Sequence, residues 1–173
     1  MNNIKKYPVT YTLLALCIMT YIATTLLFSI DMNAMQGLAA GGFNPYYVHV
    51  THQYYRLITA NFIHFGLMHI VVNCYSLFDL SCFAEYLIGT KKYIIVILAS
   101  MLSTTGLPYI AYLLFGTGAH TVSGGVSGII FGIIGAIGAL YLFFPSQLRD
   151  IARSLGLWIA SLHCNSLYSI FLL

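Results

Sequence analysis

The sequence predicts an all-α, polytopic membrane helix bundle with about five transmembrane helices. Of its 173 residues, 60% are hydrophobic and only 6% are charged, and the mean hydropathy is +0.86. A soluble domain carries roughly 25% charged residues, so this chain lacks the polar surface that water requires. Only helices or closed barrels satisfy every backbone group inside a bilayer. The apolar runs are long and do not alternate as barrel strands do, which favours helices in one domain over residues 1–173.

Five apolar runs have the length that a membrane-spanning helix needs, which is about 20 residues. They cover residues 9–30, 61–83, 93–115, 124–144 and 155–173. Pro108 and Gly106 are expected to bend the third run, which a helix inside a bundle tolerates. Residues 31–60 lie between the first two runs and are rich in Gly, Tyr and His. This stretch is predicted to be a long interfacial loop among the lipid headgroups.

The basic residues predict the orientation of the chain. If all five runs span the membrane, six of the seven Lys and Arg residues fall on one side: Lys5, Lys6, Lys91, Lys92, Arg149 and Arg153. Only Arg56 falls on the opposite side. Because cytoplasmic loops carry the excess of Lys and Arg, the N-terminus is expected in the cytoplasm. The expected location is the plasma membrane of a bacterium.

The second run carries an unusual set of polar side chains. His69 and Asn73 are four residues apart and share one face of a helix, whereas His64 and His69 would lie about 140° apart. A two-histidine metal site on a helix needs the four-residue spacing and a carboxylate ligand, so no metal and no cofactor are predicted. His69 and Asn73 either hydrogen-bond across helices or point as two donors into a shared cavity.

The stretch "SGGVSGIIFG", residues 123–132, places a serine among glycines at the start of the fourth run. Gly124, Gly128 and Gly132 form a ridge of small residues that lets another helix approach closely. This ridge does not explain the hydroxyl group of Ser127. At the start of a helix, free N–H groups favour negative charge. A serine there could attack a carbonyl group while its own N–H, with the two polar groups of the second run, stabilises the oxyanion.

Four motifs, in this order along the chain, resemble those of the rhomboid family of intramembrane serine proteases. Tyr55 and Arg56 with "LITANFIH" resemble the family's W/Y-R-L-x-T-x-x-F-x-H segment, and "HFGLMHIVVN" is similar to its H-x-x-x-x-H-x-x-x-N. Glu85 and Gly89 resemble the E-x-x-x-G signal, and "GVSG" matches G-x-S-G. The resemblance covers about residues 36–144.

The resemblance implies a rhomboid-like fold and an endopeptidase that cuts transmembrane segments near the outer leaflet. Ser127 would be the nucleophile, His69 and Asn73 would be oxyanion donors, and Gly125 would belong to the serine motif. The other motif positions would be structural: Tyr55, Arg56, His64, Glu85, Gly89, Gly128 and Gly132. The implied partners are transmembrane protein substrates and the lipid bilayer, with no nucleic acid and no metal.

A serine nucleophile needs a general base at neutral pH. The family supplies this base from a histidine in an H-x-G-G-x-x-x-G motif on a sixth helix, and the 173 residues contain no such motif. His163 is expected about 13 Å too deep to reach Ser127, and the family does not use a histidine at the position of His120. The chain is therefore expected to be a truncated rhomboid that lacks the C-terminal helix carrying the base. This polypeptide is not expected to cleave a model substrate.

Two alternatives remain open at this point. One is a catalytically dead rhomboid-like protein that binds transmembrane helices. The other is a small channel or transporter with His69, Asn73 and Asp79 along its path, which the scarcity of charge in the spans disfavours. The cysteines are not in a metal-binding spacing and are interpreted as small core residues: Cys17, Cys74, Cys82 and Cys164.

Overall fold

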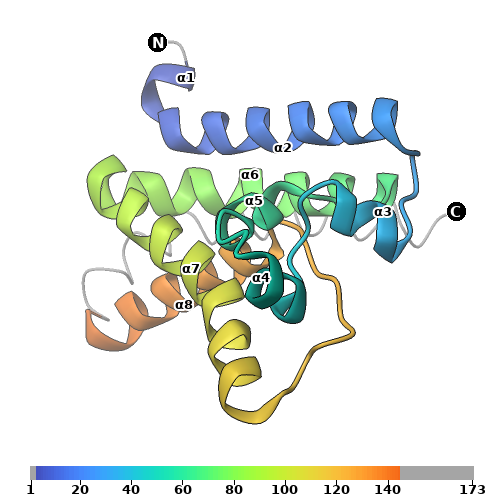
Figure 1. The fold of residues 1–173 in the computed structure, drawn as a ribbon. Coiled ribbons are helices and arrows are strands. Elements are labelled where there is room, and N and C mark those ends of the chain that lie inside the picture. Colours follow the sequence, from blue (N-terminus) through green and yellow to red (C-terminus); the bar gives the residue numbers. More distant parts are fainter. Residues whose placement is uncertain (1–2, 145–173) are drawn as a thin grey trace, which may run out of the picture. The chain divides into compact units, whose positions relative to one another are not determined.

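The computed structural model describes residues 3–144 (Figure 1). The chain divides into two compact units, Met1–Gly135 and Ala136–Leu173, and the contacts described below lie within the first. The elements are α1 (Asn3–Lys6), α2 (Pro8–Leu27), α3 (Ala34–Ala39), α4 (Pro45–Thr51), α5 (Arg56–Thr59), the 3₁₀ turn η1 (Ala60–Phe62), α6 (Leu67–Ile88), α7 (Thr90–Phe115) and α8 (Ser127–Phe143). Residues 3–144 contain no strand, only an isolated bridge between Phe43 and Ser123.

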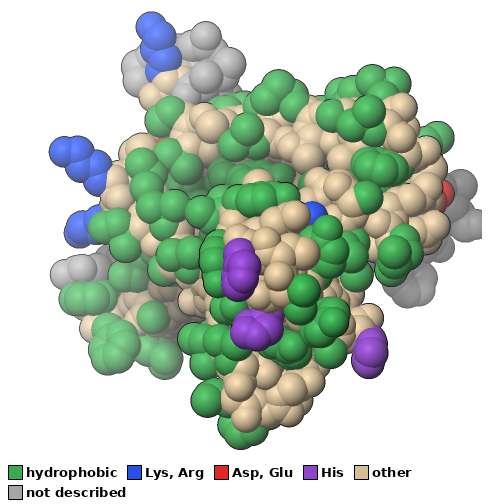
Figure 2. Space-filling model, in the orientation of Figure 1, with side chains coloured by type: hydrophobic (Ala, Val, Ile, Leu, Met, Phe, Trp, Pro, Cys, Tyr) green, Lys and Arg blue, Asp and Glu red, His purple; other side chains and the backbone are tan. Residues whose placement is uncertain are grey.

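Within residues 3–144, the three helices α2, α6 and α7 are long and apolar enough to cross a membrane, and α8 is a shorter apolar helix of 17 residues. In Figure 1, α2 and α6 lie side by side and antiparallel, and α6 also packs against α7. Green, hydrophobic side chains cover much of the visible surface in Figure 2, as expected where lipid replaces water. These features confirm the predicted all-α membrane helix bundle. The predicted fifth span, residues 155–173, lies outside the described residues.

The predicted start of the second span was wrong by six residues, because the chain does not enter α6 directly. Residues Ala60–Phe62 form a separate 3₁₀ turn, and Ile63 and Gly66 have extended backbone conformations. The helix therefore begins at Leu67 instead of residue 61. It continues to Ile88, five residues past the predicted end, where Gly89 stops it with a φ of +77°. Glycine adopts this left-handed region without strain, which explains the motif glycine at this position.

The third and fourth helices differ less from the predicted spans. Helix α7 starts at Thr90, three residues early, and continues through Pro108 to Phe115. Helix α8 starts at Ser127 instead of residue 124, because the preceding residues are not helical and Gly125 has a φ of +115°. Ser127 is thus the first residue of α8, as the sequence indicated.

The interfacial stretch 31–60 is folded into short helices and does not span. Asn33 caps α3 through a reciprocal pair of hydrogen bonds with Gln36. Phe43, Val48 and Ala60 form a small hydrophobic core, against which Leu57 and Tyr109 pack. The Thr105 hydroxyl of α7 donates a hydrogen bond of 2.7 Å to the Leu57 carbonyl. The stretch is thereby attached to α7.

Arg56 holds the two halves of this stretch together. It is only 4% exposed, and its guanidinium group donates to the carbonyl oxygens of Leu38 at 2.6 Å and Gly42 at 2.9 Å. The same group lies 4.7 Å from the ring centroid of Tyr47. Arginine suits this position because its planar fork of donors bonds several carbonyls while it stacks on an aromatic ring.

Glu85 joins α2, α6 and α7 at one end of the bundle. It is 2% exposed. Its carboxylate accepts hydrogen bonds from the backbone N–H groups of Val9 (3.2 Å) and Thr10 (2.9 Å), and from the hydroxyls of Thr10 (2.8 Å) and Thr90 (3.1 Å). The first N–H groups of a helix have no partner within that helix. Glu85 therefore caps α2 from a neighbouring helix.

We predict that Glu85→Ala lowers the free energy of unfolding by roughly 3 kcal/mol, because it leaves buried N–H and O–H groups of α2 unpaired. Glu85→Gln should cost less, since one oxygen acceptor remains. Unfolding in detergent measures both changes, with Asp79→Asn on the same helix as a control near zero. An unchanged stability of Glu85→Ala would contradict the capping role.

Candidate active site

His69 lies in the first turn of α6 and faces the chain that leads into α8. A Cβ atom added to Gly125 would lie 2.8 Å from His69 Nε2 and 3.0 Å from Cε1, so the imidazole edge rests directly on this glycine. Ser127 follows two residues later, and two residues span at most about 7 Å. The fold therefore brings His69 and Ser127 close together, although 58 positions separate them in the sequence.

The segment before Ser127 is held by backbone bonds to the interfacial stretch. Phe43 and Ser123 exchange two N–H to carbonyl bonds of 2.8 Å each, and the Gly125 N–H donates to the Ala60 carbonyl at 2.9 Å. A side chain on Gly124 would collide with the Ile63 carbonyl oxygen, at 2.7 Å. Only glycine permits these close approaches, which explains the paired glycines before the serine.

His64 lies before α6 and not on it, which corrects the expected 140° separation from His69. Because the loop turns there, the two imidazole ring centroids are only 5.1 Å apart. His64 Nδ1 lies 3.1 Å from the Phe62 carbonyl oxygen, which can only accept, so Nδ1 carries the hydrogen. Nε2 then accepts a long bond of 3.4 Å from the Val126 N–H. His64 thus contacts the residue immediately before Ser127.

The charge state of His64 follows from its surroundings. The side chain is fully buried. Burial, and next the nearby His69, lower the pKa of His64 from 6.5 to about 4. The ring is therefore neutral at pH 7, as its two hydrogen bonds require, because a protonated ring could not accept from Val126.

His69 and Asn73 share one face of α6, as predicted from their spacing. His69 Nδ1 accepts a bond of 3.4 Å from the Phe65 N–H, so a neutral ring carries its hydrogen on Nε2, the atom beside Gly125. The Asn73 amide nitrogen donates to the His69 carbonyl at 2.8 Å, and Asn73 is 7% exposed. Each side chain carries a hydrogen-bond donor, and His69 is the one that lies against the segment before α8.

Gly128 and Gly132 lie against α7. A Cβ atom on Gly128 would overlap the Thr104 side chain, and one on Gly132 would overlap Ser100. Small residues thus face each other along the contact between α7 and the first half of α8. This contact sets the position of Ser127, which is partly buried.

Asn44 positions the segment that leads into α8, a role that was not predicted from the sequence. It is 6% exposed. Its oxygen accepts from the Tyr47 N–H at 2.7 Å and caps α4, while its amide nitrogen donates to the carbonyls of Ala119 (2.9 Å) and Thr121 (2.8 Å). The dipeptide Asn44–Pro45 is a typical helix start and could have indicated the cap. Nothing in it indicates the bonds to residues 75 and 77 positions away.

The remaining predicted residues lie apart from this cluster. Tyr55 is exposed, 5.6 Å from the Arg56 guanidinium, and His120 is exposed. His163 and Cys164 lie outside the described residues. Cys17 is buried, and Cys74 and Cys82 are half-buried free thiols. Over residues 3–144, no three His, Cys, Asp or Glu side chains gather in a way that could hold a metal ion.

We predict that protonation of His64 makes unfolding easier in mild acid. Below pH 6.5 the unfolded chain binds a proton at this residue, while the folded chain binds it only near pH 4. Stability should therefore fall by about 3 kcal/mol as the pH drops from 6.5 to 4, and not further below. Unfolding of wild type in detergent across this range, with His64→Gln as the non-titrating reference, measures the effect. His120→Gln should lose as much stability as wild type between pH 6.5 and 4. If stability depends on pH equally in wild type and in His64→Gln, the prediction is refuted.

We also predict that Asn44→Asp loosens residues 121–125 without loosening α4. Aspartate keeps the oxygen that caps α4 but loses the two donated bonds, and buried bonds of this kind contribute about 1–3 kcal/mol. Backbone amide exchange of this segment should rise roughly tenfold to a hundredfold. Asn44→Ala should raise backbone amide exchange both in residues 121–125 and in α4. If Asn44→Asp exchanges like wild type while Asn44→Ala does not, only the helix cap matters.

Comparison with known proteins identifies the family. The model of the Rhomboid domain matches residues 51–171, which include His64, His69, Asn73 and Ser127. A search of curated protein sequences finds no match to this chain. The domain match covers most of the chain, and the all-α architecture of apolar helices agrees with it. The chain is an integral membrane protein that belongs to the rhomboid family, a family of intramembrane proteases.

Proposed function

We propose that the chain forms the nucleophile and oxyanion parts of an intramembrane serine endopeptidase. The observation that carries this proposal is the contact of His69 Nε2 with Gly125, two residues before Ser127 at the first turn of α8. In this proposal the Ser127 hydroxyl attacks the carbonyl carbon of a peptide bond. The electron pair moves to the carbonyl oxygen, which becomes the oxyanion.

Three kinds of donor are available to this oxyanion. The first N–H groups of α8 have no partner within their helix and favour negative charge. The His69 tautomer described above presents Nε2–H on the same side. Asn73 uses one amide hydrogen on its own helix, so its second hydrogen is available. Donors aimed at developing charge usually supply the largest part of such catalysis.

The general base is proposed to come from outside residues 3–144. His64 and His69 each use their acceptor nitrogen for a backbone N–H, of Val126 and Phe65 respectively. Neither ring can accept the Ser127 proton without losing that bond. Without a base supplied from elsewhere, residues 3–144 are therefore expected to leave a transmembrane substrate uncut.

The proposed orientation places the site at the outer side. Tyr86, next to the lysine-rich end of the bundle, is 17 residues from His69 on α6, or about 26 Å along the helix axis. If the lysines face the cytoplasm, His69 and Ser127 lie near the outer leaflet. The proposed substrate is a transmembrane segment, cut where it reaches that level.

Reaction of the 173-residue chain with a fluorophosphonate in detergent tests the nucleophile. We expect slow labelling confined to Ser127 and accelerated by added imidazole, which replaces the base. Ser127→Ala should abolish it, and Ser123→Ala, an exposed serine of the same segment, should not. His69→Ala and Asn73→Ala should each slow labelling roughly a hundredfold.

Two outcomes would contradict the proposal. Labelling of Ser127 no faster than that of Ser123, with or without imidazole, would favour a rhomboid-like protein that binds transmembrane helices without cutting them. Fast labelling without imidazole would show that a base exists among the residues present.

A further inference from the structure

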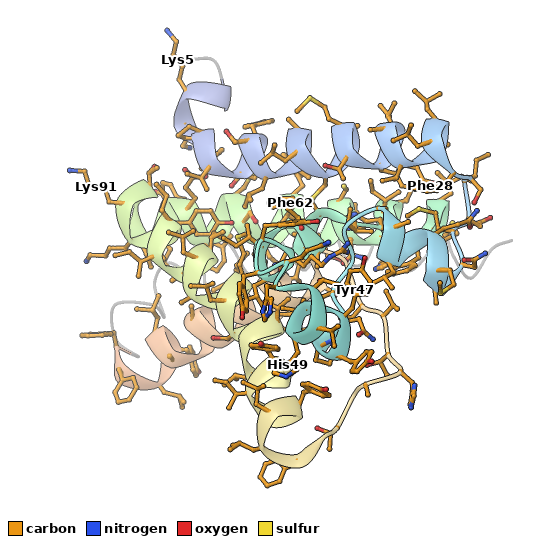
Figure 3. All side chains as sticks on the ribbon, viewed as in Figure 1. Lys5, Phe28, Tyr47, His49, Phe62 and Lys91 are labelled. Carbon is orange, nitrogen blue, oxygen red and sulfur yellow. The ribbon has the colours of Figure 1, made fainter. Side chains whose placement is uncertain are left out.

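Two pairs of lysines that are far apart in the sequence lie at the same end of the bundle. Lys5 and Lys6 end α1, and Lys91 and Lys92 lie in the first turn of α7; all four are exposed. Figure 3 shows Lys5 pointing upward and Lys91 pointing to the left from the same end of the bundle, and Figure 2 shows separate blue side chains along that end. This cluster, termed the lysine end below, is a property of the fold.

Glu85 joins the two segments that carry these pairs. It binds Val9 and Thr10, which follow the first pair, and Thr90, which precedes the second. The carboxylate itself is 2% exposed and already engaged by backbone and hydroxyl donors. It therefore organises the four ammonium groups but is shielded from the surface that they form.

The lysine end lies at the level where helices leave the membrane. Helices α6 and α7, joined through Gly89, turn around here, and α2 begins here. The Lys6 ammonium lies 5.1 Å from the ring centroids of both Tyr7 and Tyr86, and Tyr86 is 58% exposed. Tyrosine and lysine together at the end of spanning helices are typical of the headgroup region. The four lysines therefore have the tyrosine-rich surroundings that are typical of residues at the level of the lipid headgroups.

We infer that the lysine end binds the headgroups of anionic phospholipids. Four positive charges from two segments face a layer in which phosphate oxygens are the available acceptors. A basic residue next to an anionic membrane surface strengthens association roughly fivefold, and salt screens the effect. A lipid bound to both pairs would hold the α2 start and the α6–α7 turn together. This inference does not depend on the proteolytic function.

Lipid selectivity measured with spin-labelled lipids tests the inference. The 173-residue chain is reconstituted into phosphatidylcholine vesicles that carry spin-labelled phosphatidylglycerol or spin-labelled phosphatidylcholine. We expect wild type to immobilise phosphatidylglycerol selectively at low salt. Replacing all four lysines with glutamine should remove the selectivity for phosphatidylglycerol. Each lysine contributes a factor of roughly five to this selectivity at most. Replacing all four with arginine, which keeps the charge, should preserve it.

Two double variants test whether both lysine pairs contribute to lipid binding or only one of them does. Lys5→Gln with Lys6→Gln, and Lys91→Gln with Lys92→Gln, should each lose part of the selectivity, and melting in detergent confirms that each variant is folded. Equal immobilisation of the two lipids by wild type would overturn the inference, as would full selectivity in the glutamine variant. Loss of the whole effect with one pair, or displacement by soluble glycerol phosphate, would also overturn it.

Discussion

The backbone before α8 imposes the constraint on which the candidate site depends. Residues 119–126 are not helical, and in an apolar surrounding each N–H and carbonyl group there needs a partner. Six of these groups find partners in the interfacial stretch and the loop before α6, from Asn44, Phe43, Ala60 and His64. Satisfying these groups also determines where the helix starts, and hence where Ser127 stands. The backbone hydrogen bonds of this segment therefore also determine the position of Ser127, the proposed nucleophile.

The interfacial stretch can serve this purpose because it is itself well anchored. Arg56 donates hydrogen bonds to the carbonyls of Leu38 and Gly42. These bonds fix the chain immediately before Phe43, the residue that pairs with Ser123. Thr105 attaches Leu57 to α7, whose Ser100 and Thr104 also meet the glycines of α8. Helix α7 thus contacts both the interfacial stretch and the start of α8, where the proposed nucleophile Ser127 lies. A stretch that looks like a connecting loop in the sequence acts as part of the scaffold.

The two ends of α6 have different tasks. Its first turn carries His69 near the start of α8, where polar side chains converge on the backbone next to a serine. Its last turn carries Glu85, which binds the first turns of α2 and α7, close to the exposed lysines. About 26 Å separate these ends, so the chemistry and the charged membrane boundary can be altered independently. His64 precedes the first end of α6 and contacts the segment before α8.

The sequence alone determined the features that depend on local pattern. Hydrophobic runs of about 20 residues predict spanning helices because the bilayer thickness requires that length. The four-residue spacing places His69 and Asn73 on one face, and the glycines around Ser127 indicate a close helix contact and a helix start. The tertiary structure alone decided the features that depend on how the non-helical segments fold. The start of α6 at Leu67, the approach of His64 to Val126 and the bonds from Asn44 to Ala119 and Thr121 all belong to this group. These contacts join residues that are 62 to 77 positions apart, and no periodic pattern encodes which distant carbonyl or N–H group will be left without a partner.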